Sequence, residues 1–157
     1  IILVFQALIT PIFWTSFSKE FYEEKKVKKT LRQAYIIQII LTIILILIYF
    51  YIDYIIKIWL GDTIEINKKI KFSLVIYMFL ATYSNIYGTL YCSINKVKQM
   101  SKISIIQGII NVPLSILLIT KMKLGVEGVV WGTNISMSIF IFWAIFYLKT
   151  IENTGGK

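Results

Sequence analysis

The chain has 157 residues, of which 57% are hydrophobic and 16% are charged, and its formal net charge is +9. Soluble domains carry roughly 45–50% apolar and 25% charged residues, so the composition argues against a soluble fold and favours a membrane protein. One cysteine and no histidine exclude a disulfide, a His/Cys metal site and histidine-assisted nucleophilic catalysis. We therefore expect no metal and no cofactor.

Charged residues separate five apolar segments. A helix of about 20 such residues crosses a hydrocarbon layer about 30 Å thick, and the residues do not alternate as barrel strands would. The sequence predicts an all-α, polytopic transmembrane bundle of about five spans. The predicted spans are about 1–17, 33–52, 72–95, 103–120 and 128–148.

The first predicted span opens the chain without a methionine and without the basic start of a signal peptide. We therefore expect an N-terminal part of the protein to precede it. Pro11 removes a backbone donor, so the helix should kink or end early there, and Pro11 is a candidate hinge. Trp14 suits the membrane interface.

The segment 18–32 is the most charged of the chain, with six basic and three acidic residues. We assign it as a basic cytoplasmic loop beside an anionic membrane leaflet. Phe21, Tyr22, Val27 and Leu31 also allow an amphipathic helix on the membrane surface, and the sequence leaves both alternatives open. The polar segment 149–157 is predicted to be a disordered tail.

The second predicted span has residues typical of a helix end, and the third has a regular pattern of tyrosines. Trp59 followed by Gly61 is typical of an interfacial anchor and a helix stop. The third span is unusually polar, and Tyr83, Tyr87 and Tyr91 recur every four residues, so they should share one helix face.

The last two spans are joined by the short link 120–128, which predicts an antiparallel helical hairpin. Gly128 and Gly132 form a small-residue pair of the kind that lets membrane helices approach closely. Pro113, inside the fourth span, is a second candidate hinge.

Five spans sort the basic residues between two membrane faces. One face collects Lys57, Lys68, Lys69, Lys71, Lys121 and Lys123. The other face collects Lys19, Lys25, Lys26, Lys28, Lys29, Arg32, Lys96, Lys98, Lys102, Lys149 and Lys157. By this count of 11 against 6, the positive-inside rule places the second face and the C-terminus in the cytoplasm. The net charge then needs no nucleic acid partner.

Five sequence elements together resemble the C-terminal half of a flippase for polysaccharide or lipid-linked oligosaccharide, of the multidrug/oligosaccharidyl-lipid/polysaccharide exporter superfamily. The elements are PIFWTSF from Pro11, the basic stretch to Arg32, IWLGD from Ile58, NVPLS from Asn111 and GVEGVVWGTNIS from Gly125. The resemblance covers nearly the whole chain. Its most specific part is the order of the last two elements, which is similar to the family's penultimate and last core helices.

The resemblance implies a two-lobed, MATE-like transporter in which this chain supplies part of the C-terminal lobe. The expected partners are an undecaprenyl-linked oligosaccharide, such as an O-antigen or capsule repeat unit, the membrane lipids and an N-terminal lobe of the same protein. The expected location is the cytoplasmic membrane, and alternating access would carry the sugar across it. No Lys or Arg lies deep in a span here, which departs from the cationic cavities of the family, so charge recognition would belong to the other lobe.

A route for a polar headgroup needs neutral hydrogen-bonding groups and flat aromatic faces inside the membrane. The candidate cavity-lining amides are Asn85, Gln107, Asn111 and Asn134, and the candidate aromatic residues are Tyr83, Tyr87 and Tyr91. Interhelical hydrogen bonding is the alternative for the amides, and ordinary packing is the alternative for the tyrosines. The acids Asp53, Asp62 and Glu127 lie at span ends, where solvation is expected rather than ion coupling.

Two other functions remain open from the sequence. One is a membrane-embedded polysaccharide polymerase or glycosyltransferase, and the other is a MATE-type small-molecule exporter. A membrane enzyme of that kind would be expected to carry acids, arginines or histidine in a sizeable loop, whereas the loops here reach only about 15–20 residues. We therefore expect a transporter and not an enzyme.

Overall fold

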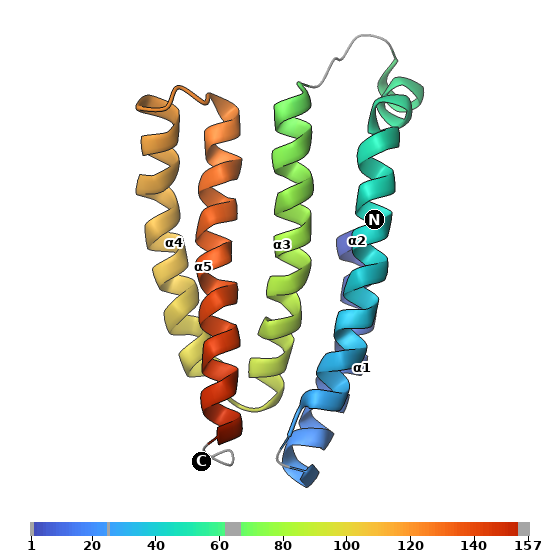
Figure 1. Ribbon diagram of the computed structural model, residues 1–157, viewed down its shortest axis with the longest axis vertical. Coiled ribbons are helices and arrows are strands. Elements are labelled where there is room, and N and C mark those ends of the chain that lie inside the picture. The colour runs from blue at the N-terminus through green and yellow to red at the C-terminus, as the bar shows by residue number, and fades with distance from the viewer. Residues whose placement is uncertain (1, 25, 62–66, 154–157) are drawn as a thin grey trace.

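The computed structural model describes residues 2–24, 26–61 and 67–153. They form α1 (Ile2–Glu24), α2 (Lys28–Leu60), α3 (Lys68–Ser93), α4 (Val97–Thr120) and α5 (Val126–Asn153). The helices run up and down in one bundle, with α3 between the α1/α2 pair and the α4/α5 pair (Figure 1). Because the described residues contain helices and no strand, the predicted all-α fold is confirmed.

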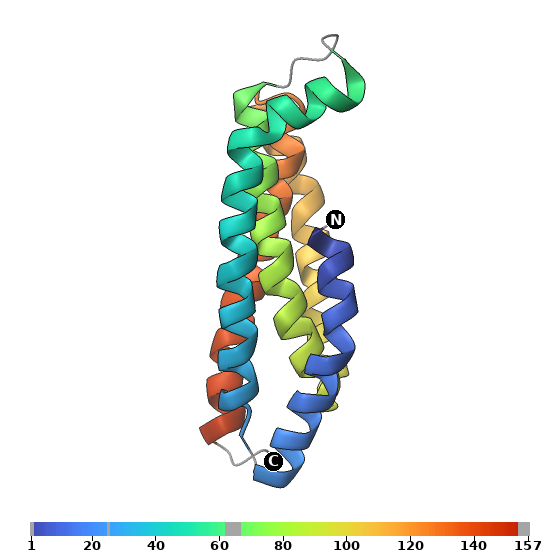
Figure 2. The ribbon, with the colours of Figure 1, turned by 90° about the vertical axis from the view of Figure 1, so that its right-hand side faces the viewer.

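Three helices in the described part of the chain are long and apolar enough to cross a membrane. They are Lys28–Ile58, Val97–Thr120 and Val126–Ile151, with mean hydropathies of 2.6, 2.0 and 1.7. The more polar α1 and α3 lie alongside these helices in the same bundle, as a bundle of about five spans requires (Figures 1 and 2). The chain is therefore a membrane protein.

The outer faces of the long helices are apolar. On α2, Ile43 and Phe50 are exposed, and on α4, Ile109 and Val112 are exposed. In water such surface would be strongly unfavourable, at roughly 25 cal/mol per Å², whereas lipid chains solvate it without that penalty. The exposed apolar faces agree with a bilayer around the bundle.

The buried core lies along α3, between α1 on one side and α5 on the other. Phe17 of α1, Leu90 and Tyr91 of α3, and Phe140 and Ala144 of α5 are almost completely buried in one cluster. In addition, α3 contacts each of the other four helices. The most polar of the predicted spans is thus the centre of the bundle, where its polar groups can find partners.

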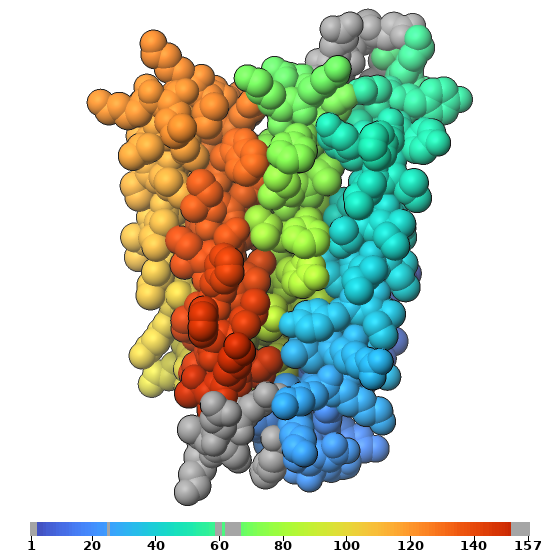
Figure 3. Space-filling model, viewed as in Figure 1, coloured from blue at the N-terminus to red at the C-terminus, as the bar shows by residue number. Residues whose placement is uncertain are grey.

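The predicted hairpin of the last two spans is confirmed, because α4 and α5 pack tightly along their length (Figures 1 and 3). A β-carbon added at Gly132 would overlap Ser115 of α4, and one added at Gly128 would lie 3.1 Å from the backbone nitrogen of Ile119. The predicted close approach at this glycine pair is therefore present. Small side chains are needed here because the two backbones are nearly in contact.

The segment 18–32 forms neither of the two expected structures. Residues 18–24 continue α1 and residues 28–32 begin α2, so only 25–27 separate the helices. Both Glu20 carboxylate oxygens accept hydrogen bonds from the first turn of α2, at 2.8 Å from the Lys29 nitrogen and 2.7 Å from the Thr30 nitrogen. This contact caps α2 with a side chain of the preceding helix.

Other predicted boundaries also shift. Helix α1 runs through Pro11 without ending, so an early end at Pro11 was wrong. Helix α2 stops at Gly61, as predicted, with a φ of 75°. At the C-terminus, residues 149–153 belong to α5, so the predicted disordered tail was wrong for these residues. The rest of that tail, 154–157, lies outside the described residues, and so does Asp62, the acid predicted at a span end.

Candidate functional site: a neutral groove on the central helix

One face of α3 is left open in the membrane-embedded bundle. Helices α1 and α4 lie on the same side of α3 (Figure 2) but make no contact with each other in the described residues. Between them is an open groove of about 420 Å³. We call it the α3 groove, and its polar and aromatic lining is Thr10, Trp14, Ser84, Asn85, Thr89 and Cys92.

The α3 groove is chemically neutral. Among the described residues that line it there is no Lys, Arg, Asp or Glu. Trp14 is 44% exposed and presents a flat aromatic surface, while the hydroxyls and the Asn85 amide offer hydrogen bonds. A groove of this kind can stack and hydrogen-bond an uncharged polar group, whereas it offers no acid–base pair for catalysis.

Of the four candidate amides, only Asn85 lines the groove. It is half-buried, and in the described hydrogen bonds it takes part through its backbone carbonyl, which accepts from the Thr89 hydroxyl at 2.8 Å. Its side-chain amide makes no hydrogen bond among the described residues. The α3 groove thus contains one of the residues that the sequence singled out for this role.

The other three amides lie on different surfaces. Asn134 is buried between α5 and α3 and donates to the Ser73 carbonyl at 3.0 Å. Asn111 of α4 accepts from Ser115 at 3.1 Å and donates to Thr133 of α5 at 3.4 Å. Gln107 is half-buried on α4. For Asn134 and Asn111 the structure therefore shows the interhelical bonding that was the alternative to cavity lining.

The tyrosine stripe holds helices together. The Tyr87 hydroxyl shares a hydrogen bond with the Tyr35 hydroxyl of α2, and the Tyr91 hydroxyl donates to the Ala144 carbonyl of α5. Tyr83 is half-buried, with its ring centroid 4.8 Å from that of Phe79. The three residues share one face of α3, as their spacing predicted, but that face packs against α2 and α5 and does not line the groove.

The two candidate hinge prolines sit in continuous helices. Pro11 is inside α1 and Pro113 is inside α4, and both side chains are exposed. The Pro11 carbonyl accepts a hydrogen bond from the Thr15 hydroxyl at 2.6 Å, which helps to satisfy the backbone that a proline perturbs. Neither proline lines the α3 groove, although each lies in a helix, α1 or α4, that contributes to its lining.

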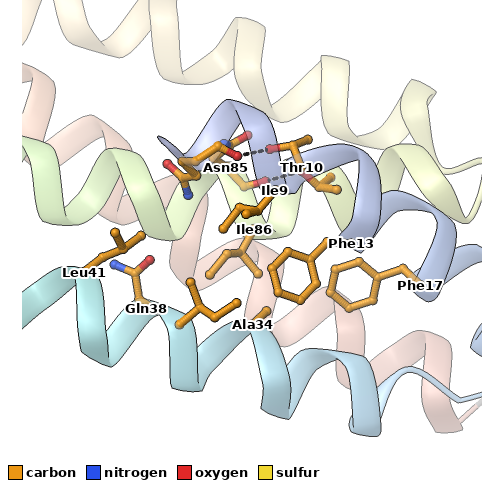
Figure 4. Close-up of a pocket in the computed structure, with 12 residues that line it drawn as sticks. Ile9, Thr10, Phe13, Phe17, Ala34, Gln38, Leu41, Asn85 and Ile86 are labelled. Carbon is orange, nitrogen blue, oxygen red and sulfur yellow. Dashed lines mark hydrogen bonds between the residues drawn. The ribbon is translucent and has the colours of Figure 1, made fainter. Parts of the chain in front are cut away.

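A buried polar cluster beside the groove was not predicted from the sequence. Gln6 of α1, Gln38 of α2 and Thr82 of α3 meet at the junction of the three helices and are each at least 96% buried. Figure 4 shows the small pocket that Gln38 lines together with Phe13, Ile86 and Asn85. The available signal was a glutamine inside each of two apolar runs, which lipid would not tolerate without a partner.

Charged contacts lie at the two ends of the bundle. At one end, burial alone would raise the pKa of Glu20, but hydrogen bonds from Thr30 and Lys29 and the charge of Lys29 outweigh it, so the pKa of Glu20 is lowered. At the other end, Lys71 is nearly buried and its ammonium lies 2.7 Å from Asp53 Oδ1. Both contacts fasten neighbouring helices, at the α1/α2 and α2/α3 turns.

Comparison with known proteins does not assign the chain to a family. No protein-family model matches the sequence, and neither a curated protein nor a solved structure matches the chain. Within the described residues, no group of three or more His, Cys, Asp or Glu side chains is placed to hold a metal ion. The case for a function therefore depends on the membrane-embedded fold and on the α3 groove.

Proposed function

We propose that the chain is part of a membrane transporter that carries a lipid-linked oligosaccharide across the cytoplasmic membrane by alternating access. The observation that supports this most is the α3 groove, a neutral, hydrogen-bonding surface between two membrane helices. Its lining suits sugar hydroxyls, and Trp14 suits the flat face of a sugar ring. The resemblance to the exporter superfamily supports the same function.

The groove is open along the side of the bundle, because its walls α1 and α4 do not meet in the described residues. A lipid-linked substrate has a polar head that must leave water and a hydrocarbon tail that need not leave the bilayer. A laterally open groove can hold the head while the tail stays in lipid. An enclosed pocket would suit a free small molecule better.

The groove also lies toward one end of the bundle. Gly88 and Met100, on either side of the α3/α4 turn, are part of its lining. The same end carries the α1/α2 turn and the last turn of α5 (Figure 1), and it holds the larger group of basic residues. By the positive-inside rule the groove faces the cytoplasmic leaflet, and the C-terminal end of α5 lies on the cytoplasmic side.

In this proposal a second lobe of the same protein would close the open side of the groove. Rocking of the two lobes would expose the headgroup first to one leaflet and then to the other. Pro11 and Pro113 are candidate hinges because they lie in the two helices that form the groove walls. The phosphate of the lipid carrier would be recognised elsewhere, because the described groove lining is uncharged.

Deleting the gene that encodes this chain tests the proposal directly. The assay measures intact lipid-linked repeat units on each face of the cytoplasmic membrane. Trapping of intact units on the cytoplasmic face supports the flippase. Units that cross but stay unpolymerised would indicate a polymerase, units that are never completed would indicate a glycosyltransferase, and normal glycan with altered drug sensitivity would indicate a MATE-type exporter.

Two substitutions separate transport from folding. Asn85→Leu removes a groove amide that makes no interhelical hydrogen bond among the described residues, so it should reduce glycan export at least severalfold at unchanged membrane abundance. Asn134→Leu, the matched control, removes the bond to Ser73 and should reduce abundance instead. Full export by Asn85→Leu would contradict a role of the α3 groove.

A further inference from the structure

Hydrogen bonds to Thr82 fix the orientation of the side-chain amides of two buried glutamines, Gln6 and Gln38. The Gln6 amide nitrogen lies 2.7 Å from the Thr82 carbonyl, which can only accept a hydrogen bond. The Gln38 amide nitrogen reaches the Thr82 hydroxyl, whose own proton goes to the Phe79 carbonyl at 2.8 Å. Both amide groups must therefore direct their nitrogens at Thr82 and their oxygens elsewhere.

The two amide oxygens that result, Gln6 Oε1 and Gln38 Oε1, are buried and have no hydrogen-bond partner. A buried acceptor without a donor is costly, and native proteins rarely leave one unpaired. Gln6 and Gln38 both line a cavity of about 20 Å³ between α1, α2 and α3 (Figure 4). One water molecule needs about 10–15 Å³ of such space.

None of the other polar groups around this cavity donates a hydrogen bond to the two glutamine oxygens. The Thr10 hydroxyl donates to the Gln6 carbonyl at 2.9 Å, and the Thr89 hydroxyl donates to the Asn85 carbonyl at 2.8 Å. The remaining walls are mainly apolar, formed by side chains such as Phe13 and Ile86. The cavity therefore holds two buried acceptors without a partner, and a small donor would satisfy them.

We propose that this cavity is a water site, in which one water donates a hydrogen bond to each of the two glutamine oxygens. The two protons of a water match the two unpaired acceptors, and the volume matches one molecule. The lining contains no carboxylate to balance a cation, and an unbalanced charge in an apolar membrane cavity is strongly unfavourable. The site would join α1 to α2 through the water.

The water site adjoins the α3 groove. Thr10, Asn85 and Thr89 line both the cavity and the groove, so these three polar residues lie between them. Their oxygens can hydrogen-bond a passing water on either side. The water site itself requires only the described fold and would exist whether or not the protein transports a glycan.

Nuclear magnetic resonance of the unchanged chain in lipid nanodiscs tests the site without a mutation. With glutamine selectively labelled with nitrogen-15, the side-chain amide protons of Gln6 and Gln38 should show cross-peaks to a long-lived water. The exposed Gln33 should show only the signature of fast-exchanging bulk water. A lack of water cross-peaks at both Gln6 and Gln38 would overturn the proposal.

A cavity-filling pair gives an independent test. Ala34 lines the cavity and is 1% exposed, so Ala34→Val should displace the water and lower the unfolding midpoint, whereas Ala7→Val on the exposed face of α1 should change it little. In a Gln6→Met, Gln38→Met background there is no acceptor to leave unpaired, so the loss should shrink or reverse. A rise in the midpoint with Ala34→Val alone, or an equal loss in both backgrounds, would contradict a bound water.

A cation is the competing occupant and has its own signature. Replacing sodium chloride by choline chloride should leave the unfolding midpoint of the unchanged chain where it is. A midpoint that rises with sodium, and only while both glutamines are present, would assign the cavity to a cation and overturn the water site.

Discussion

Glu20 accepts a hydrogen bond from the backbone nitrogen of Thr30 at 2.7 Å, so the last turns of α1 cap the first turn of α2. A carboxylate at a helix N-terminus is stabilised by the unpaired N–H groups and by the helix dipole. Glu20→Gln keeps the shape but removes the charge, and it should lower the free energy of unfolding by about 1 kcal/mol at neutral pH.

The Glu20 contact also sets a pH dependence. Because the pKa of Glu20 is lowered from 4.5 in the folded state, its contribution to stability is complete above that value and is lost as the pH falls through the folded pKa. Unfolding in detergent from neutral pH down to acid should show the difference between the unchanged chain and Glu20→Gln shrinking below pH 4.5. Glu24→Gln, at an exposed residue nearby, is the control, and an equal effect of both changes would contradict the capping role.

Gly132 provides a test of the α4–α5 hairpin. A β-carbon at this position would overlap the Ser115 hydroxyl and lie 3.0 Å from the Ser115 Cα. Gly132→Ala should therefore destabilise the chain by roughly 1–3 kcal/mol, despite the better helix propensity of alanine. Adding Ser115→Ala should recover only part of the loss, because the backbone contact remains.

The matched control for Gly132 is Gly108 on α4, where an added β-carbon meets nothing within 4 Å. Gly108→Ala should be neutral or stabilising by up to about 1 kcal/mol. Both variants can be compared by denaturant unfolding in the same detergent. A Gly132→Ala protein as stable as Gly108→Ala would show that the two helices can separate at no cost.

The sequence was sufficient to predict the helices and the hairpin because both depend on local patterns. Long apolar runs can satisfy their backbone in lipid only as helices, and small residues four apart permit close packing. The segment 18–32 was misassigned because charge density suggested a loop, whereas the Glu20 cap depends on a contact between two helices. Charge alone does not reveal such a contact.

The candidate site was predicted only in part, for a similar reason. The partners of Asn134 and Tyr91 are the backbone carbonyls of Ser73 and Ala144, and a sequence does not show which carbonyls a side chain will meet. Gln6 and Gln38 come together only because α3 brings Thr82 between them. Asn85 is the candidate amide that lines the α3 groove, and its role there stays a prediction.

The ion pair between Asp53 and Lys71 joins α2 to α3 and should be energetically asymmetric. Lys71 is 9% exposed and Asp53 is 67% exposed, so Asp53→Asn leaves a nearly buried ammonium without its partner. We expect a loss of about 1 kcal/mol, moderated by the exposure of Asp53. In Lys71→Met the same Asp53→Asn change should cost little.

A double-mutant cycle of Asp53→Asn and Lys71→Met, followed by denaturant unfolding, measures this coupling. It should decrease at high salt, because one partner is exposed. Lys69→Met, at an exposed lysine in the same turn of α3, serves as the control and should show no coupling to Asp53. Zero coupling between Asp53 and Lys71 at low salt would mean that the contact does not contribute to stability.

The proposed orientation predicts opposite labelling of two lysine positions at opposite ends of the bundle. Lys26 lies in the α1/α2 turn and Lys121 lies just after α4, and both are exposed. With Cys92 replaced by serine, Lys121→Cys should react with an impermeant thiol reagent on intact cells. Lys26→Cys should react only after permeabilisation, because the larger basic group is retained in the cytoplasm. The reverse pattern would place the α3 groove in the outer leaflet, where it could release a headgroup but not load one from the cytoplasm.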